Sequence, residues 1–268
     1  MSKGKFIVID GLDGIGKSVV LGAIVDYLKN KGQRVLDLHE YWEEHGFHPD
    51  FDNLSPHFGK SGGDKENGHP NPYYVNLDDY DVIYSSEPTH VGIGKVIRQE
   101  VIAQNGRPYH ANLTAECYST DRLVLYKRVI LPALNAGKTV IQSRSVSTSI
   151  VYQPIQSELQ KENSLTIKEV LALQGNKLAL DHAPDLLIIP TIKDVKILFE
   201  RLSRRAKDDN CNFEKLKFQE TIKPLFEGKK LRKIFEKRGS IVKYLDAGIS
   251  IESTKKQAVD LYREVLED

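Results

Sequence analysis

The N-terminal segment at residues 5–18, KFIVIDGLDGIGKS, runs from a β-branched apolar stretch directly into the pattern Gly-x-x-x-x-Gly-Lys-Ser. A complete phosphate-binding loop between a strand and a helix is a specific signal, because both the motif and its context match. The glycines let the backbone turn so that N–H groups face phosphate oxygens. Lys17 supplies positive charge for the β- and γ-phosphates, and the Ser18 hydroxyl suits Mg²⁺. The chain is therefore predicted to bind ATP through Gly11, Leu12, Asp13, Gly14, Ile15, Gly16, Lys17 and Ser18.

Composition argues against several other classes of protein. Basic and acidic residues number 38 and 37, so no attraction to a nucleic acid polymer or an anionic membrane is expected. The longest apolar runs have the length of a strand, and no signal-peptide block precedes the first strand. The two cysteines, Cys117 and Cys211, have neither metal-site nor redox spacing. We therefore expect a cytoplasmic protein whose partners are small-molecule nucleotides, with secretion as the less favoured alternative.

Apolar β-branched runs alternate with helical patterns along the chain. Strands are predicted at residues 5–10, 34–38, 81–85, 139–142, 186–189 and 241–245. Helices are predicted at residues 17–31, 92–104, 113–136, 193–206, 213–237 and 252–267. This alternation predicts an α/β fold, a single domain over residues 1–268 with a parallel sheet covered by helices on both faces. Ligands of such sheets bind beyond the carboxyl ends of the strands.

Residues 43–79 interrupt the alternation and are rich in Gly, Pro, Asn, Asp and His. A loop of this length in a compact domain is usually functional or disordered. Its histidines are His45, His48, His57 and His69, and His39 lies just before it. Their spacing matches no standard metal motif and no cysteine assists, so a polar insertion is favoured over a metal site. Such an insertion could cover the acceptor site or form an oligomer contact.

Several later segments carry further motifs. They are SEPTxxGIGxxIR at 86–98, YSTDR at 118–122, LPALxxG at 131–137, SRSxxTSxxYQ at 143–153, APDL at 183–186, RxxRRxK at 201–207 and NFE at 212–214. Each is weak alone, but together with the phosphate loop and in this order they resemble the thymidylate kinase family. The resemblance covers nearly the whole chain except residues 43–79. It implies a five-stranded parallel sheet with surrounding helices, a mobile lid, and Mg²⁺-dependent transfer of the ATP γ-phosphate to dTMP.

The resemblance also assigns contacts with the phosphate acceptor. Arg144 would grip the acceptor phosphate, Arg122 would read the edge of the pyrimidine, and Tyr118 would stack on the base. Arginine suits these tasks because its rigid fork donates two hydrogen bonds at once. Tyr118 and Arg122 lie one helical turn apart and share a face. The predicted acceptor set is Asp13, Glu87, Arg98, Tyr118, Arg122, Arg144, Thr148, Ser149 and Tyr152.

Further roles follow from the same resemblance. Tyr152 would lie near the sugar and help to select deoxyribose. Asp13 would approach the 3′-hydroxyl of the acceptor and help to position the reacting phosphates. Glu87 would bind Mg²⁺ through water, beside Ser18, or order the acceptor arginines. The family commonly forms homodimers through helices beside the sheet, so a homodimer is expected by analogy.

A basic run near residues 201–214 is predicted to form the lid over the triphosphate. The run comprises Arg201, Arg204, Arg205 and Lys207, and its alternative explanation is a solvated helix end. The phosphate loop holds Gly14 where some family members carry an arginine, and members without that arginine supply one from the lid. Arg204 or Arg205 is therefore the predicted transferring arginine, and Arg201 is predicted to contact ATP. The predicted catalytic set is Lys17, Asp13, Arg144, Arg204 and Arg205.

Three positions depart from the family pattern. Ser86 stands where the family usually has arginine, Ser143 where it usually has aspartate, and Cys211 where the lid usually has an acidic residue. These departures leave two alternatives open. The pair Arg144-Ser145 suggests a deoxynucleoside kinase, although Ser143 cannot act as the carboxylate base that such an enzyme needs. The missing charges also suit a catalytically weak paralogue that binds nucleotides.

Overall fold

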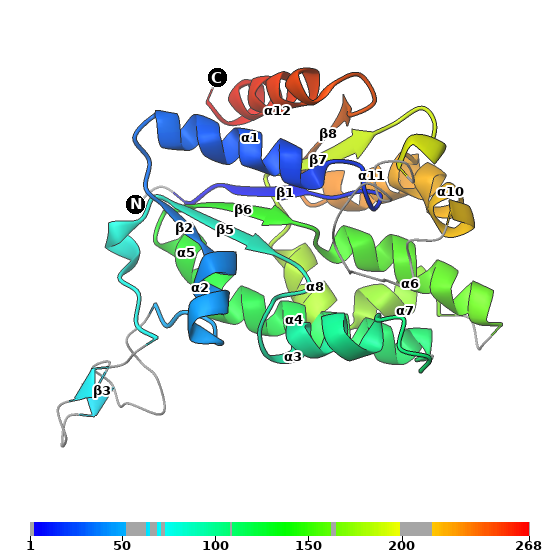
Figure 1. The fold of residues 1–268 in the computed structure, drawn as a ribbon, viewed down its shortest axis with the longest axis horizontal. Coiled ribbons are helices and arrows are strands. Elements are labelled where there is room, and N and C mark those ends of the chain that lie inside the picture. Colours follow the sequence, from blue (N-terminus) through cyan, green and yellow to red (C-terminus); the bar gives the residue numbers. More distant parts are fainter. Residues whose placement is uncertain are drawn as a thin grey trace.

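A computed structural model describes residues 3–51, 63–64, 69–70, 73–107, 109–161, 165–198 and 216–267. Its centre is a six-stranded parallel sheet in the order β2-β5-β6-β1-β7-β8 (Figure 1). The strands are β1 (Phe6–Ile9), β2 (Val35–Asp37), β5 (Val82–Ser86), β6 (Thr139–Ser143), β7 (Leu186–Thr191) and β8 (Ile241–Asp246). The predicted α/β fold is confirmed, but the count of five strands that the resemblance implied is wrong. The sheet has six strands because every run predicted as a strand pairs with a neighbour.

Helices cover both faces of the sheet, which explains why its central strands are apolar throughout. All four residues of β1 are buried. On one face α1 (Lys17–Asn30) packs against α12 (Ile251–Leu266), and α4 (Ala111–Leu125) and α5 (Leu131–Asn135) lie on the other (Figure 1). The carboxyl ends of the strands remain as the place where a ligand can approach.

The first and last predicted helices agree with α1 and α12 to within one residue at each end. The helix predicted at 113–136 changes type along its length, from α4 through a π-helical turn (Tyr126–Ile130) to α5. The helix predicted at 92–104 likewise consists of α3 (Gly92–Val96) and a π-helical turn (Ile97–Val101). The sequence does not indicate these π-helical turns, because one extra residue in a turn barely alters the spacing of the apolar residues.

The helix predicted at 213–237 is in fact two helices, α10 (Leu216–Phe226) and α11 (Lys229–Glu236). Gly228 separates them with an extended backbone. The sequence pattern also missed four helices: α2 (Leu38–His45), α6 (Val146–Gln160), α7 (Ile167–Ala172) and α8 (Gln174–Asp181). α6 begins with Val, Ser, Thr and Ile residues of low helix propensity. It is helical because residues 146–153 are all buried, so tertiary packing decides its conformation.

The predicted insertion at residues 43–79 is described in part. It starts inside α2 and includes a short antiparallel pair, β3 (Gly63–Asp64) with β4 (His69–Pro70), and a 3₁₀ turn (Leu77–Asp79). Within the described part of the chain, no group of His, Cys, Asp or Glu side chains is placed to hold a metal ion. The same residues contain no helix that is long and apolar enough to cross a membrane. The predicted lid near residues 201–214 lies outside the described residues.

The contact between α4 and α8 depends on Gly175. A methyl group at this position would lie 1.8 Å from the carbonyl oxygen of Ser119 and 3.0 Å from the backbone nitrogen of Leu123. Gly175→Ala is therefore expected to lower the free energy of unfolding by about 3 kcal/mol, because it forces two helices apart. Urea denaturation followed by circular dichroism measures this change.

Gly22→Ala is the matched control, since it adds the same methyl group to α1 with no neighbouring heavy atom within 4 Å. It should leave stability unchanged or raise it by up to about 1 kcal/mol. Equal free energies of unfolding for the two variants would show that the close approach of α4 to α8 at Gly175 does not control the stability of the fold.

Candidate active site

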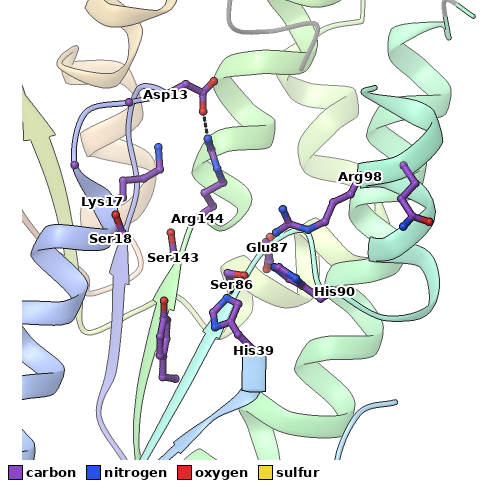
Figure 2. A pocket seen from close by; sticks show the side chains of 14 residues that line it. Asp13, Lys17, Ser18, His39, Ser86, Glu87, His90, Arg98, Ser143 and Arg144 are labelled. Atoms are coloured by element: carbon purple, nitrogen blue, oxygen red, sulfur yellow. Dashed lines mark hydrogen bonds and ion pairs between the residues drawn. The ribbon is translucent and has the colours of Figure 1, made fainter. Parts of the chain in front are cut away.

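A cavity of about 640 Å³ lies beyond the carboxyl ends of β1, β2, β5 and β6 (Figure 2). A volume of this size suits a drug- or nucleotide-sized ligand. It is lined by Asp13, Gly14, Gly16, Lys17, Ser18, His39, Tyr84, Ser86, Glu87, His90, Arg98, Gln99, Ser143 and Arg144. The fold thus brings residues of the phosphate loop and several predicted acceptor residues into one space.

The phosphate loop has the conformation that its glycines make possible. Gly14 and Gly16 have φ angles of 74° and 101°, in the left-handed region that other residues avoid. Gly16 precedes the first turn of α1, whose N-terminal N–H groups favour anions. The Lys17 ammonium donates to the carbonyl oxygens of Gly11 (3.0 Å) and Leu12 (2.6 Å). These contacts hold its charge inside the loop, where the β- and γ-phosphates of a bound nucleotide would lie.

Asp13 joins the phosphate loop to the other side of the cavity. One carboxylate oxygen pairs with the guanidinium of Arg144, and the other accepts from Tyr152 Oη (2.9 Å) and Gln219 Nε2 (3.0 Å). Burial raises the pKa of Asp13, but the charges of Arg144 and Lys17 outweigh it and the pKa is lower than usual. Asp13 is therefore ionised at neutral pH and holds Arg144 against the loop.

Arg144 follows the last residue of β6 with a φ of 65°. This conformation costs a non-glycine residue energy and is concentrated at functional positions. Burial alone would lower the pKa of Arg144, but the surrounding groups, with the Asp13 carboxylate foremost among them, together outweigh burial. The pKa therefore lies above its usual value, and the guanidinium stays charged. Its face also lies over the Tyr152 ring, with 5.8 Å between Cζ and the ring centroid.

The Asp13 ion pair makes part of the stability depend on pH. A carboxylate whose pKa is lower in the folded chain stabilises the fold above its unfolded-state pKa, about 4, and this contribution disappears as the pH falls through the folded-state value. As the pH falls below about 4, the wild type should therefore lose stability more steeply than Asp13→Asn, whose amide does not titrate. Urea unfolding at a series of pH values measures both slopes, and parallel slopes would contradict a lowered pKa.

Asp10 was missed as a site residue, although it follows the apolar run of β1. Its buried carboxylate accepts from the backbone N–H groups of Gly11 (2.8 Å) and Thr148 (2.8 Å). It also accepts from the hydroxyl groups of Ser147 and Thr148. Asp10 thus caps the N-terminus of α6 from a neighbouring strand and ties the loop to the turn that carries Arg144. The sequence did contain one indication of this role, a single carboxylate directly after an apolar strand. A carboxylate that is buried in such a place needs hydrogen-bond donors.

A second buried ion pair joins Glu87 to Arg122. Arg122 Nε donates to one Glu87 oxygen (2.8 Å), and its other nitrogens donate to Asn176 Oδ1 and Ser149 Oγ. The remaining Glu87 oxygen accepts from Gln142 Nε2 (2.9 Å). Burial raises the pKa of Glu87 to about 7, while the charge of Arg122 acts in the opposite direction. Arg122 is only 1 % exposed, so protein groups occupy its guanidinium.

Comparison with known proteins agrees with this geometry. A family model described as thymidylate kinase matches residues 74–258, well over half of the chain. The chain belongs to the thymidylate kinase family. A thymidylate kinase of Caldicellulosiruptor saccharolyticus is 26% identical over 266 residues, covering 99% of this chain and 97% of the relative. A thymidylate kinase of Ligilactobacillus salivarius is 24% identical over 256 residues, covering 93% and 97% respectively.

A solved thymidylate kinase from Candida albicans has the same fold. It superposes with a TM-score of 0.59 over 98% of this chain and 93% of its own, at 18% sequence identity. The likeness extends over the full α/β architecture. In folds of this kind ligands bind beyond the carboxyl ends of the strands, where the cavity lies.

The residues that the family resemblance assigned to the acceptor are distributed unevenly around the cavity. Arg144 and Arg98 line it, and Arg98 Nε also donates to the carbonyl oxygens of Pro88 (3.1 Å) and Thr89 (3.2 Å). Tyr118 and Arg122 are buried and do not line it. Their predicted contacts with the base remain predictions, and these contacts require the Glu87–Arg122 pair to rearrange or the cavity to extend toward α4.

The predicted residues of α6 also contact protein groups. Thr148, Ser149 and Tyr152 are buried, and each hydrogen-bonds a charged side chain described above. They are therefore placed to orient those charges. The lid residues lie outside the described residues, and they are Arg201, Arg204, Arg205 and Lys207.

The two serines that depart from the family pattern lie opposite each other. Ser86 ends β5, Ser143 ends β6, and they are partners in the parallel register. Both line the cavity. Arginine and aspartate at these positions would place opposite charges side by side, so the two serines remove one positive and one negative charge together. The departures therefore leave the net charge of this edge unchanged.

Sequence reasoning also missed a wall formed by His39, Tyr84 and His90. The His39 ring centroid lies 4.7 Å from that of Tyr84 and 5.0 Å from that of His90. His39 comes from the start of α2, directly after β2, while Tyr84 belongs to β5. The available signal was a histidine directly after a predicted strand, at the sheet edge where ligands bind.

Proposed function

We propose that this protein acts as a thymidylate kinase, which transfers the γ-phosphate of ATP to dTMP to give ADP and dTDP. The observation that carries the proposal is the Asp13–Arg144 ion pair. Within a single cavity, it joins the loop that would bind ATP to an arginine that would bind the phosphate of the acceptor nucleotide. Membership of the family supports dTMP as the acceptor.

The phosphate loop and the start of α1 hold the donor. Backbone N–H groups and the Lys17 ammonium contact the β- and γ-phosphates, where negative charge must be stabilised during transfer. Phosphoryl transfer depends mainly on positioning and on charge, so a preorganised lysine contributes at the moment of reaction. Lys17 is 9 % exposed, which strengthens its interaction with the phosphates.

Arg144 and Arg98 hold the acceptor phosphate in line with the donor. When this phosphate binds, it competes with Asp13 for the Arg144 guanidinium. The Asp13 carboxylate then keeps its contacts with Tyr152 and Gln219, which orient it toward the 3′-hydroxyl of the acceptor. The ion pair thus presets Arg144 and releases it to the substrate.

Mg²⁺ is the cofactor that fits this loop. Ser18 lines the cavity beside Lys17, and its hydroxyl oxygen could coordinate Mg²⁺ together with phosphate oxygens and water. Glu87, the other predicted ligand, already uses both carboxylate oxygens for Arg122 and Gln142. We therefore propose that Glu87 orders Arg122. Bound Mg²⁺ would neutralise charge on the β- and γ-phosphates.

Four further expectations belong to the same proposal. Tyr118 and Arg122 recognise the base when the α4 side of the cavity opens, and the basic lid supplies Arg204 or Arg205 to the transferring phosphate. The enzyme acts in the cytoplasm and forms a homodimer, by analogy with its family.

A coupled assay of ADP formation, with ATP, Mg²⁺ and each of dTMP, dUMP, dCMP and dGMP, tests the proposal. We expect turnover of dTMP to exceed that of the others. Absence of turnover with every monophosphate would refute it. Thymidine and deoxycytidine in the same assay test the alternative of a deoxynucleoside kinase, which the family membership does not favour.

A further inference from the structure

His39 enters the cavity from β2 and α2, which lie before residue 74, where the match to the family model begins. Its ring is held at both nitrogens. Nδ1 lies 2.9 Å from Asp37 Oδ1, and Nε2 lies 2.7 Å from Ser86 Oγ. Figure 2 shows the ring directly beside Ser86 at the end of β5. An element outside the matched region therefore builds part of the cavity wall.

Asp37 fixes the position of this ring twice. Its carboxylate contacts the ring and also accepts from the His39 backbone N–H (2.8 Å), which caps the start of α2. Burial raises the pKa of Asp37, but the hydrogen bonds from His39 outweigh it and lower the pKa. Tyr84 and His90 pack against the ring at the centroid distances given above, and Trp42 at 5.7 Å. The ring cannot turn away from Ser86 without losing all of these contacts.

The proton positions decide what the pair offers to a ligand. An ionised carboxylate only accepts, so the proton between Asp37 and His39 belongs to Nδ1. If the ring is neutral, Nε2 accepts from the Ser86 hydroxyl, whose lone pairs then face the cavity. If both ring nitrogens carry protons, Nε2–H donates to Ser86 Oγ, and the hydroxyl hydrogen is free to donate into the cavity.

We propose that the His39–Ser86 pair, oriented by Asp37, binds the phosphate of the acceptor nucleotide. The inference rests on the proposed function, since it concerns the acceptor of that reaction. A phosphate dianion needs hydrogen-bond donors, and the Ser86 hydroxyl donates into the cavity when an Nε2–H group of His39 is its partner. Ser86 is the register partner of Ser143, and Arg144 follows Ser143. The phosphate is therefore held from the ends of two adjacent strands.

Binding of dTMP and of thymidine, which differ by the phosphate, tests the proposal directly. Isothermal titration calorimetry measures both affinities without requiring turnover. Fluorescence gives a second readout, because Trp42 is the single tryptophan and its ring lies 5.7 Å from His39 and 5.9 Å from His90. His39→Ala should weaken dTMP about 10- to 100-fold and thymidine less than about twofold, since the lost hydrogen bond goes to a charged group.

Further variants distinguish a direct role of the His39–Ser86 pair in phosphate binding from a role in supporting the local structure. His39→Gln keeps an N–H group near Ser86 and should recover part of the dTMP affinity, whereas Asp37→Asn should weaken dTMP by less than His39→Ala does. His45→Ala is the matched control: His45 lies on the same helix, stacks on Tyr41 and does not line the cavity. It should leave both affinities unchanged.

The outcomes distinguish this inference from the proposed function. Equal weakening of dTMP and thymidine by His39→Ala would assign His39 to the nucleoside and overturn the inference, as would two unchanged affinities. The same loss in His45→Ala would attribute the effect to α2 and overturn it too. If the wild type binds dTMP through His39 but does not phosphorylate it, the proposed function fails and the phosphate contact stands.

Discussion

Lys17→Ala is expected to lower the turnover number about 10²- to 10³-fold, because it removes the positive charge that stabilises the transferring phosphate. The Lys17 ammonium is directed into the loop by the carbonyl oxygens of Gly11 and Leu12. The substitution leaves these two carbonyl oxygens without this donor, but the left-handed conformations of Gly14 and Gly16 do not depend on the charge. Steady-state kinetics at saturating dTMP, with ATP varied, measures the loss.

Lys29→Ala is the matched control, since Lys29 is an exposed lysine on the same helix. It should leave the turnover number within about twofold of the wild type, as surface substitutions usually do. A Lys17→Ala enzyme with more than about a tenth of wild-type turnover would show that the charge does not act on the transferring phosphate. That result would also weaken the assignment of the cavity to ATP.

The strands were predictable because each is a short apolar run whose neighbours in sequence are turn residues. β1 is buried along its length and β7 is buried in all but its last residue, as expected for strands of a parallel sheet that is covered on both faces. α6 was not predictable in this way. Its Ser, Thr and Val residues disfavour a helix locally, and its conformation depends on the carboxylate of Asp10 and on burial against other elements.

The site was predictable where a motif is local and not where partners are distant in sequence. The phosphate loop is contiguous, so its lysine and glycines could be assigned from spacing. Gln219 contacts Asp13 across 206 residues of sequence, and no pattern at either position indicates this pair. His39 and Ser86 are 47 positions apart in the sequence, and the predicted insertion lies between them. The register of β2 beside β5 brings them together.

Arg144→Ala is expected to raise the KM for dTMP about 10- to 100-fold, because a bidentate charge-assisted contact with the acceptor phosphate is lost. The KM for ATP should change far less. The structure adds a second effect, since the substitution leaves the Asp13 carboxylate without its cation. The pair is partly buried, with 21% of the Arg144 side chain and 11% of the Asp13 side chain exposed, so we expect stability to fall by about 2 kcal/mol, less than for a fully buried pair.

The double variant Asp13→Asn, Arg144→Ala separates these two effects. It removes both charges, so no carboxylate is left unpaired, and it should recover part of the lost stability while the KM for dTMP stays high. Thermal unfolding and kinetics on the two variants give both quantities. If the double variant also recovered the affinity for dTMP, Arg144 would act by neutralising the Asp13 carboxylate and would not contact the acceptor. If the KM values for ATP and dTMP rose together in the single variant, the ion pair would support the phosphate loop as a whole, and the acceptor phosphate would have to be held by Arg98 and the His39–Ser86 pair.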